Sequence, residues 1–176
     1  AGLMESTIDD DGYLYTWNQI YFPTVRWKNL RIEHELYCMG HFIEAAVSHY
    51  RVTGSRRLLD PAVRTADLIV REFSRSRRRF PGHQEIELAL VKLARVTGDD
   101  RYRDQAERFL ANRGRALLPG LLLAGEMLSH LARSRKVARM EKRAGNDPLG
   151  FELGENMAAI FCYMGFIDPF IQGGAE

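Results

Sequence analysis

The densest group of residues able to do chemistry spans residues 34–41 and reads His-Glu-Leu-Tyr-Cys-Met-Gly-His. On a helix, His34, Cys38 and His41 fall at i, i+4 and i+7 and share one face. Imidazole and thiolate groups are good zinc ligands. Three ligands on one helix nevertheless span about 10 Å, so at most two could hold the same ion. The alternative interpretation is that Cys38 is a small core residue and the histidines line a pocket or pair with Glu44.

A second group, Phe-Pro-Gly-His-Gln-Glu-Ile-Glu, spans residues 80–87. Its Pro81-Gly82 turn brings His83 to a helix start, and ligand sites tend to lie at such ends of elements. Glu85 and Glu87 fall in the first helical turn, where carboxylates interact favourably with the helix dipole. We therefore interpret the two glutamates as capping residues and His83 as a candidate ligand-binding residue.

The elements that must position these groups have helical periodicity. From residue 33 onward, apolar residues recur at steps of three and four, and Gly54 ends the helix because glycine tolerates a left-handed conformation. A second helix is predicted from about Pro61, followed by a solvated, arginine-rich loop at residues 75–79. The aromatic residues and turn formers between residues 11 and 32 predict a structured loop, because dense aromatics are rarely left in solvent.

These helices belong to a repeat. Arg51-Val52-Thr53-Gly54 returns as Arg95-Val96-Thr97-Gly98, at an offset of 44 residues that also aligns Ala45 with Ala89. Each unit is a helix, a Thr-Gly turn and a second helix, and such hairpins must stack to bury their apolar faces. The repeat predicts an all-α fold, either a solenoid or an α/α toroid. Six hairpins of this length need roughly 260 residues, so about three hairpins make a short stack or an incomplete ring.

The repeat also relates the two groups of candidate residues. At the same offset, Glu85 lies opposite His41, which predicts that both groups occupy equivalent helix starts in successive hairpins. In a toroid, inner helices converge on one cavity, so His34 and His83 are predicted to face a common ligand.

The rest of the chain is less regular. Residues 120–143 predict a further helix with a basic C-terminal half, which we interpret as a solvated helix end because cations favour helix C-termini. A basic patch for an anionic partner is the alternative. The Gly145-Asn146-Asp147-Pro148 segment ends this helix, and residues 156–166 predict a short apolar helix.

Four segments together resemble glycoside hydrolase family 127, which includes β-L-arabinofuranosidases. They are Asp11-Gly12-Tyr13-Leu14, Arg26-Trp27-Lys28-Asn29-Leu30, the group at 34–41 and the stretch from Pro81 to Leu90. The resemblance covers about residues 10–115, whereas residues 116–176 match only loosely. It implies a fold of helical hairpins that form part of an (α/α)6 toroid.

The resemblance also implies an activity, the removal of terminal L-arabinofuranose with retention of stereochemistry. The family's sugar-contacting histidines fall on His34 and His83. Family members use a zinc-bound cysteine thiolate as nucleophile and a glutamate as acid/base. Cys162 lies in no recognisable zinc cluster, and Gln84 replaces the proline usual after Pro-Gly-His.

We found neither the zinc ligands nor a catalytic residue in this sequence. We therefore expect residues 1–176 to be a single partial catalytic domain, part of a zinc-dependent parent enzyme and inactive alone. Two other readings remain open. One is a noncatalytic α/α-repeat module that binds carbohydrate or protein, and the other is a zinc enzyme built on His34 and Cys38.

Composition limits the classes of partner and the cellular compartment that we expect for this chain. A net charge of +2 is too small to indicate a nucleic-acid or membrane partner, and no apolar run approaches the roughly 20 residues of a membrane span. The two cysteines make no disulfide framework and indicate a reducing compartment, by default the cytoplasm. Because an open toroid exposes apolar helix faces, we also expect self-association.

Overall fold

The computed structural model describes residues 7–114 and 119–146, and the chain divides into two units, Ala1–Pro119 and Gly120–Glu176. Every regular element of the described residues is a helix, which confirms the all-α prediction. The helices are α2 (Thr16–Tyr21), α3 (Glu35–Thr53), α4 (Leu59–Phe73), α5 (Glu85–Thr97), α6 (Asp100–Gly114) and α7 (Pro119–Arg143). None of these described helices combines the length and apolar character that crossing a membrane requires.

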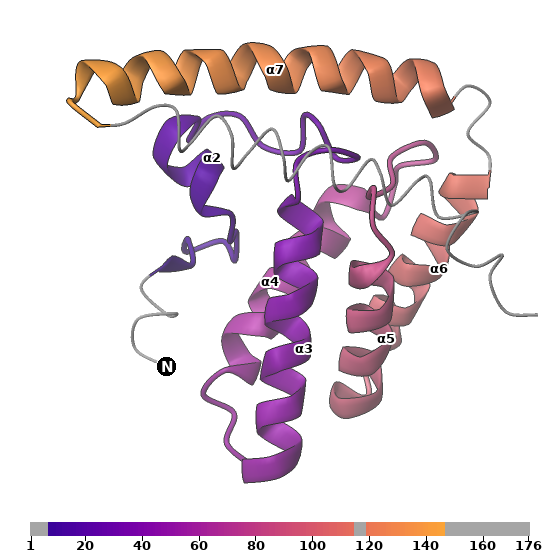
Figure 1. Cartoon of the computed structure of the whole chain (residues 1–176). Helices are drawn as coiled ribbons and strands as arrows, with labels where there is room; N and C mark the ends of the chain where they lie inside the picture. Colours follow the sequence, from indigo (N-terminus) through magenta and orange to yellow (C-terminus); the bar gives the residue numbers. More distant parts are fainter. Residues whose placement is uncertain (1–6, 115–118, 147–176) are drawn as a thin grey trace, which may run out of the picture. The chain divides into compact units, whose positions relative to one another are not determined.

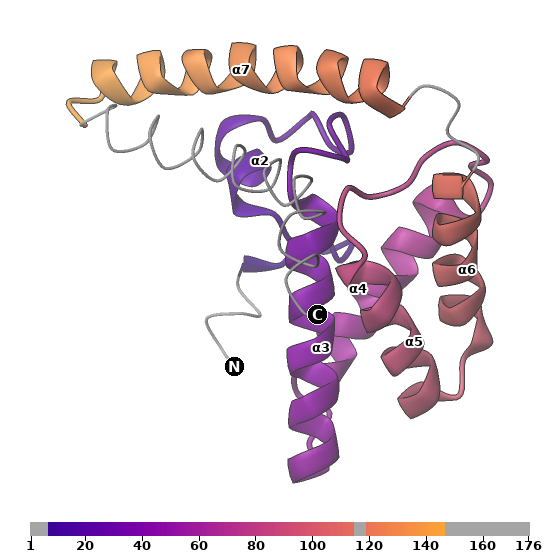
Figure 2. The ribbon, with the colours of Figure 1, turned by 45° about the vertical axis from the view of Figure 1, so that its right-hand side comes forward.

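Two helical hairpins stack in the first unit. α3 packs against α4 and α5 against α6, while contacts of α3 with α5 and of α4 with α6 join the hairpins. Figures 1 and 2 show α3 and α5 as neighbouring helices in both views. Each hairpin thus covers an apolar face of the other, as the sequence repeat predicts.

The Thr-Gly turns have the predicted conformation. Gly54 and Gly98 follow α3 and α5 with φ of 68° and 74°, in the left-handed region. Their backbone N–H groups donate to the carbonyl oxygens of Tyr50 and Ala94, both at 2.8 Å. These bonds satisfy carbonyl groups at the helix ends, so the repeated turn is a repeated helix cap.

The repeat holds at the helix ends but not at the helix starts. α3 and α5 end 44 residues apart but start 50 residues apart, because α3 has 19 residues and α5 only 13. His41 therefore lies in the second turn of α3 and Glu85 in the first turn of α5. The two residues do lie opposite each other, as the offset predicts, but their positions relative to the two helix starts are not equivalent. Burial differs as well, since Ala45 is exposed whereas Ala89 is buried.

The segment before α3 contains a helix that the sequence did not indicate. α2 has six residues, too few to establish a period, and isolated helices this short are unstable in water. Its Trp17 packs edge-on against Tyr21, with ring centroids 5.2 Å apart. The prediction that this aromatic segment is structured is confirmed, because Tyr13, Trp17 and Trp27 are all buried.

Aromatic rings link this segment to the hairpins. The ring of Trp27 meets those of Tyr13 and Phe73 edge-on, with centroids 5.2 Å apart in each pair, and Phe73 in turn contacts Phe109 of α6. Such pairs add about 0.5–1.5 kcal/mol beyond the area they bury. α4 begins at Leu59, slightly before the predicted start.

α7 confirms the helix predicted over residues 120–143. Five of its C-terminal basic residues are exposed, in accord with a solvated helix end, namely Arg135, Lys136, Arg139, Lys142 and Arg143. The sixth, Arg133, is buried, which that interpretation did not predict. The break follows at Gly145, whose φ is 84°. The helix predicted at residues 156–166 lies outside the described residues.

Candidate functional site

The structure brings His34 and His83 together, as predicted. Their ring centroids are 5.8 Å apart, and the ring of Tyr37 lies 5.5 Å from His34 and 4.9 Å from His83. The three rings share one open cavity, whose full lining is Leu30, Arg31, Glu33, His34, Tyr37, Pro81, Gly82 and His83. A cavity with a few convergent polar side chains is the usual form of a small-ligand site.

The start of α3 supplies two of these rings. His34 immediately precedes the helix, and its carbonyl oxygen accepts the N–H of Cys38 at 2.8 Å. Tyr37 follows three residues later and therefore projects from the same side of the first turn. The cavity thus lies beside the helix start, where the chain changes from loop to helix.

The His83 wall depends on a close backbone contact. Gly82 donates its N–H to the carbonyl oxygen of Leu30 at 3.1 Å. A Cβ atom placed on Gly82 would lie 2.2 Å from the carbonyl oxygen of Arg31, well inside van der Waals contact. Only glycine lets the two loops approach this closely, so the Pro81-Gly82 turn is a packing requirement of the site.

Two side chains from the last turn of α6 form hydrogen bonds with the segment that contains Gly82 and leads to His83. The Arg113 guanidinium donates to the carbonyl oxygen of Gly82 at 3.2 Å and to Glu87 Oε1 at 3.1 Å. Asn112 Nδ2 donates to the carbonyl oxygens of Ser76 and Arg79, both at 3.0 Å. These two side chains fix the segment that leads into His83.

Glu87 is more than a capping residue. Both Glu85 and Glu87 lie in the first turn of α5, as predicted, but Glu87 is buried, with 4% of its surface exposed. Burial raises the pKa of its carboxyl group, and the hydrogen bond from Arg113 opposes that shift. The structural role of Glu87 is to bind Arg113. The sequence did not indicate this contact, because the two residues are 26 positions apart.

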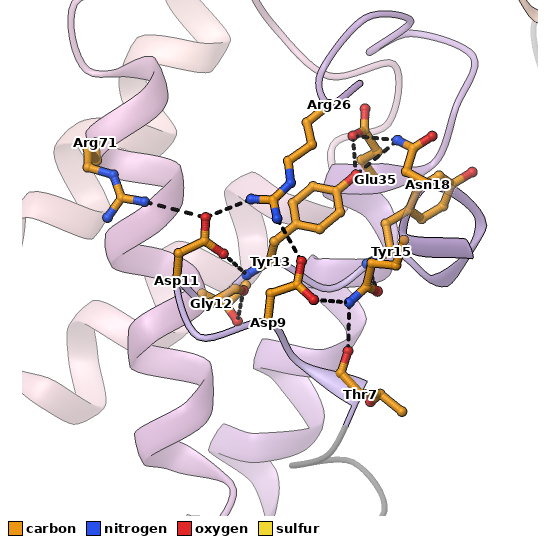
Figure 3. A network of polar contacts seen from close by, with 12 residues as sticks. Thr7, Asp9, Asp11, Gly12, Tyr13, Tyr15, Asn18, Arg26, Glu35 and Arg71 are labelled. Atoms are coloured by element: carbon orange, nitrogen blue, oxygen red, sulfur yellow. Dashed lines mark hydrogen bonds and ion pairs between the residues drawn. The ribbon is translucent and has the colours of Figure 1, made fainter. Parts of the chain in front are cut away.

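A buried carboxylate, Glu35, follows His34 at the start of α3, and Figure 3 shows it beside Tyr13 and Asn18. Its Oε1 accepts hydrogen bonds from Tyr13 Oη at 2.5 Å, Asn18 Nδ2 at 2.9 Å and the Trp27 N–H at 2.9 Å. Burial raises the pKa of Glu35, although these hydrogen bonds stabilise the charged form. The sequence could have indicated that Glu35 is buried, because it lies four residues before Met39 and therefore on the same buried face of α3.

An ion-pair network on the surface side of Tyr13 secures the beginning of the segment (Figure 3). Arg26 binds both Asp9 and Asp11 at 2.6 Å, and its guanidinium lies 4.0 Å from the centroid of the Tyr13 ring. Burial opposes ionisation of Asp11, but the hydrogen bond from Arg26 prevails and lowers its pKa. Thr65 of α4 donates to the Gly12 carbonyl oxygen at 2.8 Å, which ties the segment to the hairpins.

A family model described as the β-L-arabinofuranosidase, GH127 catalytic domain matches residues 3–151 of this chain. The chain belongs to this family. The segments that carried the resemblance, at 11–14, 26–30, 34–41 and 81–90, supply most of the cavity lining and the network behind it, and Arg31 and Glu33 of the lining lie between them.

Individual GH127 proteins are similar over the same region. The non-reducing end β-L-arabinofuranosidase of Bifidobacterium longum subsp. longum is 39% identical over 111 residues, which cover 59% of this chain and 17% of that protein. The crystal structure of Ara127N-Se, a GH127 β-L-arabinofuranosidase from Geobacillus stearothermophilus T6, matches 73% of this chain and 20% of its own, with 42% identity and a TM-score of 0.65.

A second solved structure, the GH127 β-arabinofuranosidase BT3674, matches 66% of this chain and 20% of its own, with 38% identity and a TM-score of 0.59. The chain thus spans about a fifth of the length of the relatives it matches. With the stacked hairpins, these likenesses confirm the expected fold, helical hairpins that form part of an (α/α)6 toroid.

The sequence offers His34, Cys38 and His41 to this GH127 chain as candidate zinc ligands, of which at most two could hold the same ion. Within residues 7–114 and 119–146, the group of three or more side chains close enough to share an ion is His41, Glu44 and Glu85, with ligand atoms within 4.8 Å of one another. This group contains no cysteine. Cys38 is exposed, so its interpretation as a small core residue is wrong.

The His41 group is a set of polar contacts between α3 and α5. His41 Nδ1 lies 3.3 Å from Glu85 Oε1, and Lys92 pairs with Glu44. His41 and Glu85 meet because the two helices end at equivalent turns, so residues at the same distance from those turns lie at the same height. The described residues therefore do not fit a zinc–thiolate centre, and Cys162 lies outside them.

Proposed function

We propose that this chain forms part of the sugar pocket of a β-L-arabinofuranosidase, in which His34 and His83 contact a terminal L-arabinofuranose. The observation that carries the proposal is the 5.8 Å separation of the two imidazole rings in one cavity. Each imidazole nitrogen can donate or accept a hydrogen bond, so both rings can reach hydroxyl groups of a single sugar. The choice of sugar is supported by the GH127 relatives, which are β-L-arabinofuranosidases.

The proposed role of the pocket is to bind and orient the sugar. Tyr37 presents an aromatic ring beside both histidines and Glu33 adds a carboxyl group to the lining, so apolar and polar groups converge on the cavity. Holding a substrate in a reactive geometry is itself a large part of catalysis. The histidines are therefore proposed as binding residues rather than as the groups that exchange protons with the glycosidic oxygen.

In the complete enzyme, we propose hydrolysis with retention of stereochemistry, a reaction that proceeds through a covalent glycosyl–enzyme intermediate. The nucleophile, its zinc ligands and the acid/base are proposed to lie in later segments of the family's catalytic domain rather than in this 176-residue chain, which covers about 20% of each solved relative. The absence of a cysteine from the one ligand group found in the described residues supports this assignment. Accordingly, we expect the 176-residue chain to bind sugar without turning it over.

Binding can be tested with methyl β-L-arabinofuranoside and the ring signals of the five histidines in NMR. The signals of His34 and His83 are expected to shift saturably. His34→Ala and His83→Ala are expected to weaken binding by about tenfold each, the value of a hydrogen bond to a polar ligand. His49→Ala on α3 is the matched control and should bind like the native chain. Binding that survives both pocket substitutions would contradict the proposal.

Hydrolysis can be tested with an aryl β-L-arabinofuranoside, added zinc and reductant. The native chain is expected to show no turnover. Turnover would make Cys38 or Cys162 the candidate nucleophile and would contradict the assignment of the chemistry to other residues. A longer protein with the remaining family segments that bound the sugar without cleaving it would favour a noncatalytic carbohydrate-binding module.

Two further expectations complete the proposal. A reducing compartment, by default the cytoplasm, is proposed because two cysteines in 176 residues make no disulfide framework. Self-association is expected because several apolar helix residues are exposed, namely Val52, Leu88 and Leu110. Light scattering over a concentration series measures it, and a monodisperse monomer at high concentration would contradict that expectation.

A further inference from the structure

We propose that Glu35 is a positioning residue for the His34–His83 pocket, and that it acts by holding the strained backbone of Trp27. The proposal rests on the proposed function, because it concerns the same pocket. Its structural consequence, the relative placement of the two histidine rings, can be measured without any sugar.

Trp27 has an unusual backbone conformation. Its φ is 63°, and it is the single non-glycine residue with positive φ in the part of the chain that the structure describes. A bulky residue in this region is strained and persists only when its surroundings enforce the conformation. The constraint on Trp27 must therefore come from specific contacts.

Two charged groups hold the backbone of Trp27 from opposite sides. Its N–H donates to Glu35 Oε1 at 2.9 Å and to Oε2 at 3.1 Å, while its carbonyl oxygen accepts from Arg79 Nη2 at 3.0 Å. Hydrogen bonds with an ionised partner are stronger than neutral ones. Glu35 follows His34 directly, and Arg79 precedes Phe80 in the segment that leads to His83, so Trp27 connects the two walls.

A hydrogen-bonded turn at residues 29–33 connects Trp27 to the cavity lining. Asn29 accepts the N–H groups of Ile32 at 3.0 Å and Glu33 at 2.8 Å with its carbonyl oxygen, and its side chain donates to Glu33 Oε1 at 2.9 Å. The intervening Leu30 accepts the N–H of Gly82. A displacement of Trp27 would therefore move the residues on which the Pro81-Gly82 turn rests, and His83 with them.

The chemistry of Glu35 favours positioning over simple packing. A buried carboxylate loses its hydration, and apolar residues of similar volume often stabilise a core as well or better. Glu35 is fully buried, yet its oxygens receive donors from three different residues of the segment that covers the start of α3. Replacing it with an apolar residue would fill the same space but would release the Trp27 N–H.

The test compares variants of the whole 176-residue chain by NMR, without sugar. Glu35→Gln keeps an oxygen that can accept the Trp27 N–H and is expected to retain the native His34 and His83 signals and the contact between their rings. Glu35→Met removes the acceptor of the Trp27 N–H, and Arg79→Met removes the donor to the Trp27 carbonyl oxygen. Both variants are expected to lose the contact between the histidine rings. Their affinity for methyl β-L-arabinofuranoside is expected to fall about tenfold.

Tyr13→Phe is the matched control, because it removes another hydrogen bond to Glu35 Oε1 but leaves the Trp27 contacts in place. It is expected to lower the melting temperature without moving the histidine signals. Folded Glu35→Met with native histidine signals would overturn the proposal, and so would Tyr13→Phe that disturbs the pocket as much as Glu35→Met.

Should Glu35→Met fail to fold, Arg79→Met acts on the same backbone from a half-buried loop residue and decides the question alone. A native chain that binds no arabinofuranoside, with histidine signals that respond to the variants as expected, would contradict the proposed function and leave the positioning role intact.

Discussion

At one end of the hairpin pair, Gly54 and Gly98 have open space where a Cβ atom would lie, whereas at the pocket end a Cβ on Gly82 would meet the Arg31 carbonyl oxygen at 2.2 Å. The turn end needs glycine for its positive φ, which is a property of the local chain. The pocket end needs glycine because two loops meet there. The turns at Gly54 and Gly98 therefore end helices, whereas the turn at Gly82 forms part of the cavity.

The charged residues of the two ends differ in the same way. Beside the first turn, Arg56 and Asp60 form an i,i+4 pair in which both side chains are more than half exposed. At the pocket end, Arg113 pairs with Glu87, whose side chain is only 5% exposed. Solvent screens the first pair, but the second is held away from water.

The largest effect is expected from Gly82→Ala. The added methyl group would overlap backbone atoms of Arg31, which cannot move independently of their loop. The free energy of unfolding should fall by about 3 kcal/mol, and arabinofuranoside binding should be lost. Urea denaturation measures the first quantity and NMR titration the second. Native-like stability would show that the loops separate easily and would break the comparison between the ends.

Arg113→Met should have the next largest effect. It leaves the Glu87 carboxylate buried without its partner and frees the Gly82 carbonyl, at a cost of about 2 kcal/mol. Arg56→Met at the turn end is the control, and it should cost less than about 0.5 kcal/mol. Equal losses in the two variants, measured by urea denaturation, would argue against a distinction between the ends.

Gly98→Ala should have a smaller effect than either pocket substitution. Nothing lies within 4 Å of the added Cβ, so the cost comes only from the positive φ of 74°, about 1 kcal/mol. Sugar binding should be unchanged, because the turn is remote from the cavity lining. Thermal unfolding and NMR titration of this variant would together show whether the turn end serves stability alone.

The pH dependence should have opposite signs at the two ends. Burial raises the pKa of Glu87 above 4.5. As the pH rises, the Glu87 carboxyl group therefore stays protonated to a higher pH in the folded chain than in the unfolded chain. The stability of the native chain relative to Glu87→Gln should therefore fall as the pH rises from 4.5 toward neutrality. Urea denaturation at pH 4 to 7 measures this trend, and a rising difference would contradict it.

At the turn end, the hydrogen bond from Arg101 lowers the pKa of Asp99 below 3.8. Asp99 therefore contributes stability above pH 3.8 that is lost as the pH falls through its lower folded-state pKa. The advantage of the native chain over Asp99→Asn should accordingly shrink on acidification below pH 3.8. The same denaturation series, extended to pH 2, checks this opposite slope.

Local sequence determined the helices and their ends. The apolar spacing of α3 placed Leu36, Met39 and Ile43 inward, and Gly54 and Gly98 marked its end and that of α5. The placement of His34 and His83 at helix starts also followed from residues close by in the chain. Helix formation and capping depend on contacts within about four residues, so sequence patterns report them well.

Only the tertiary structure decided how the pocket is held together. The anchoring of Glu87 by Arg113 and the hydrogen bond from Arg79 to Trp27 join residues 26 and 52 positions apart. The short helix α2 has too few residues to show a period. The repeat also misplaced the helix starts, because α5 is shorter than α3. A buried charge or a close backbone contact depends on which segments meet in space, and helical periodicity does not specify that.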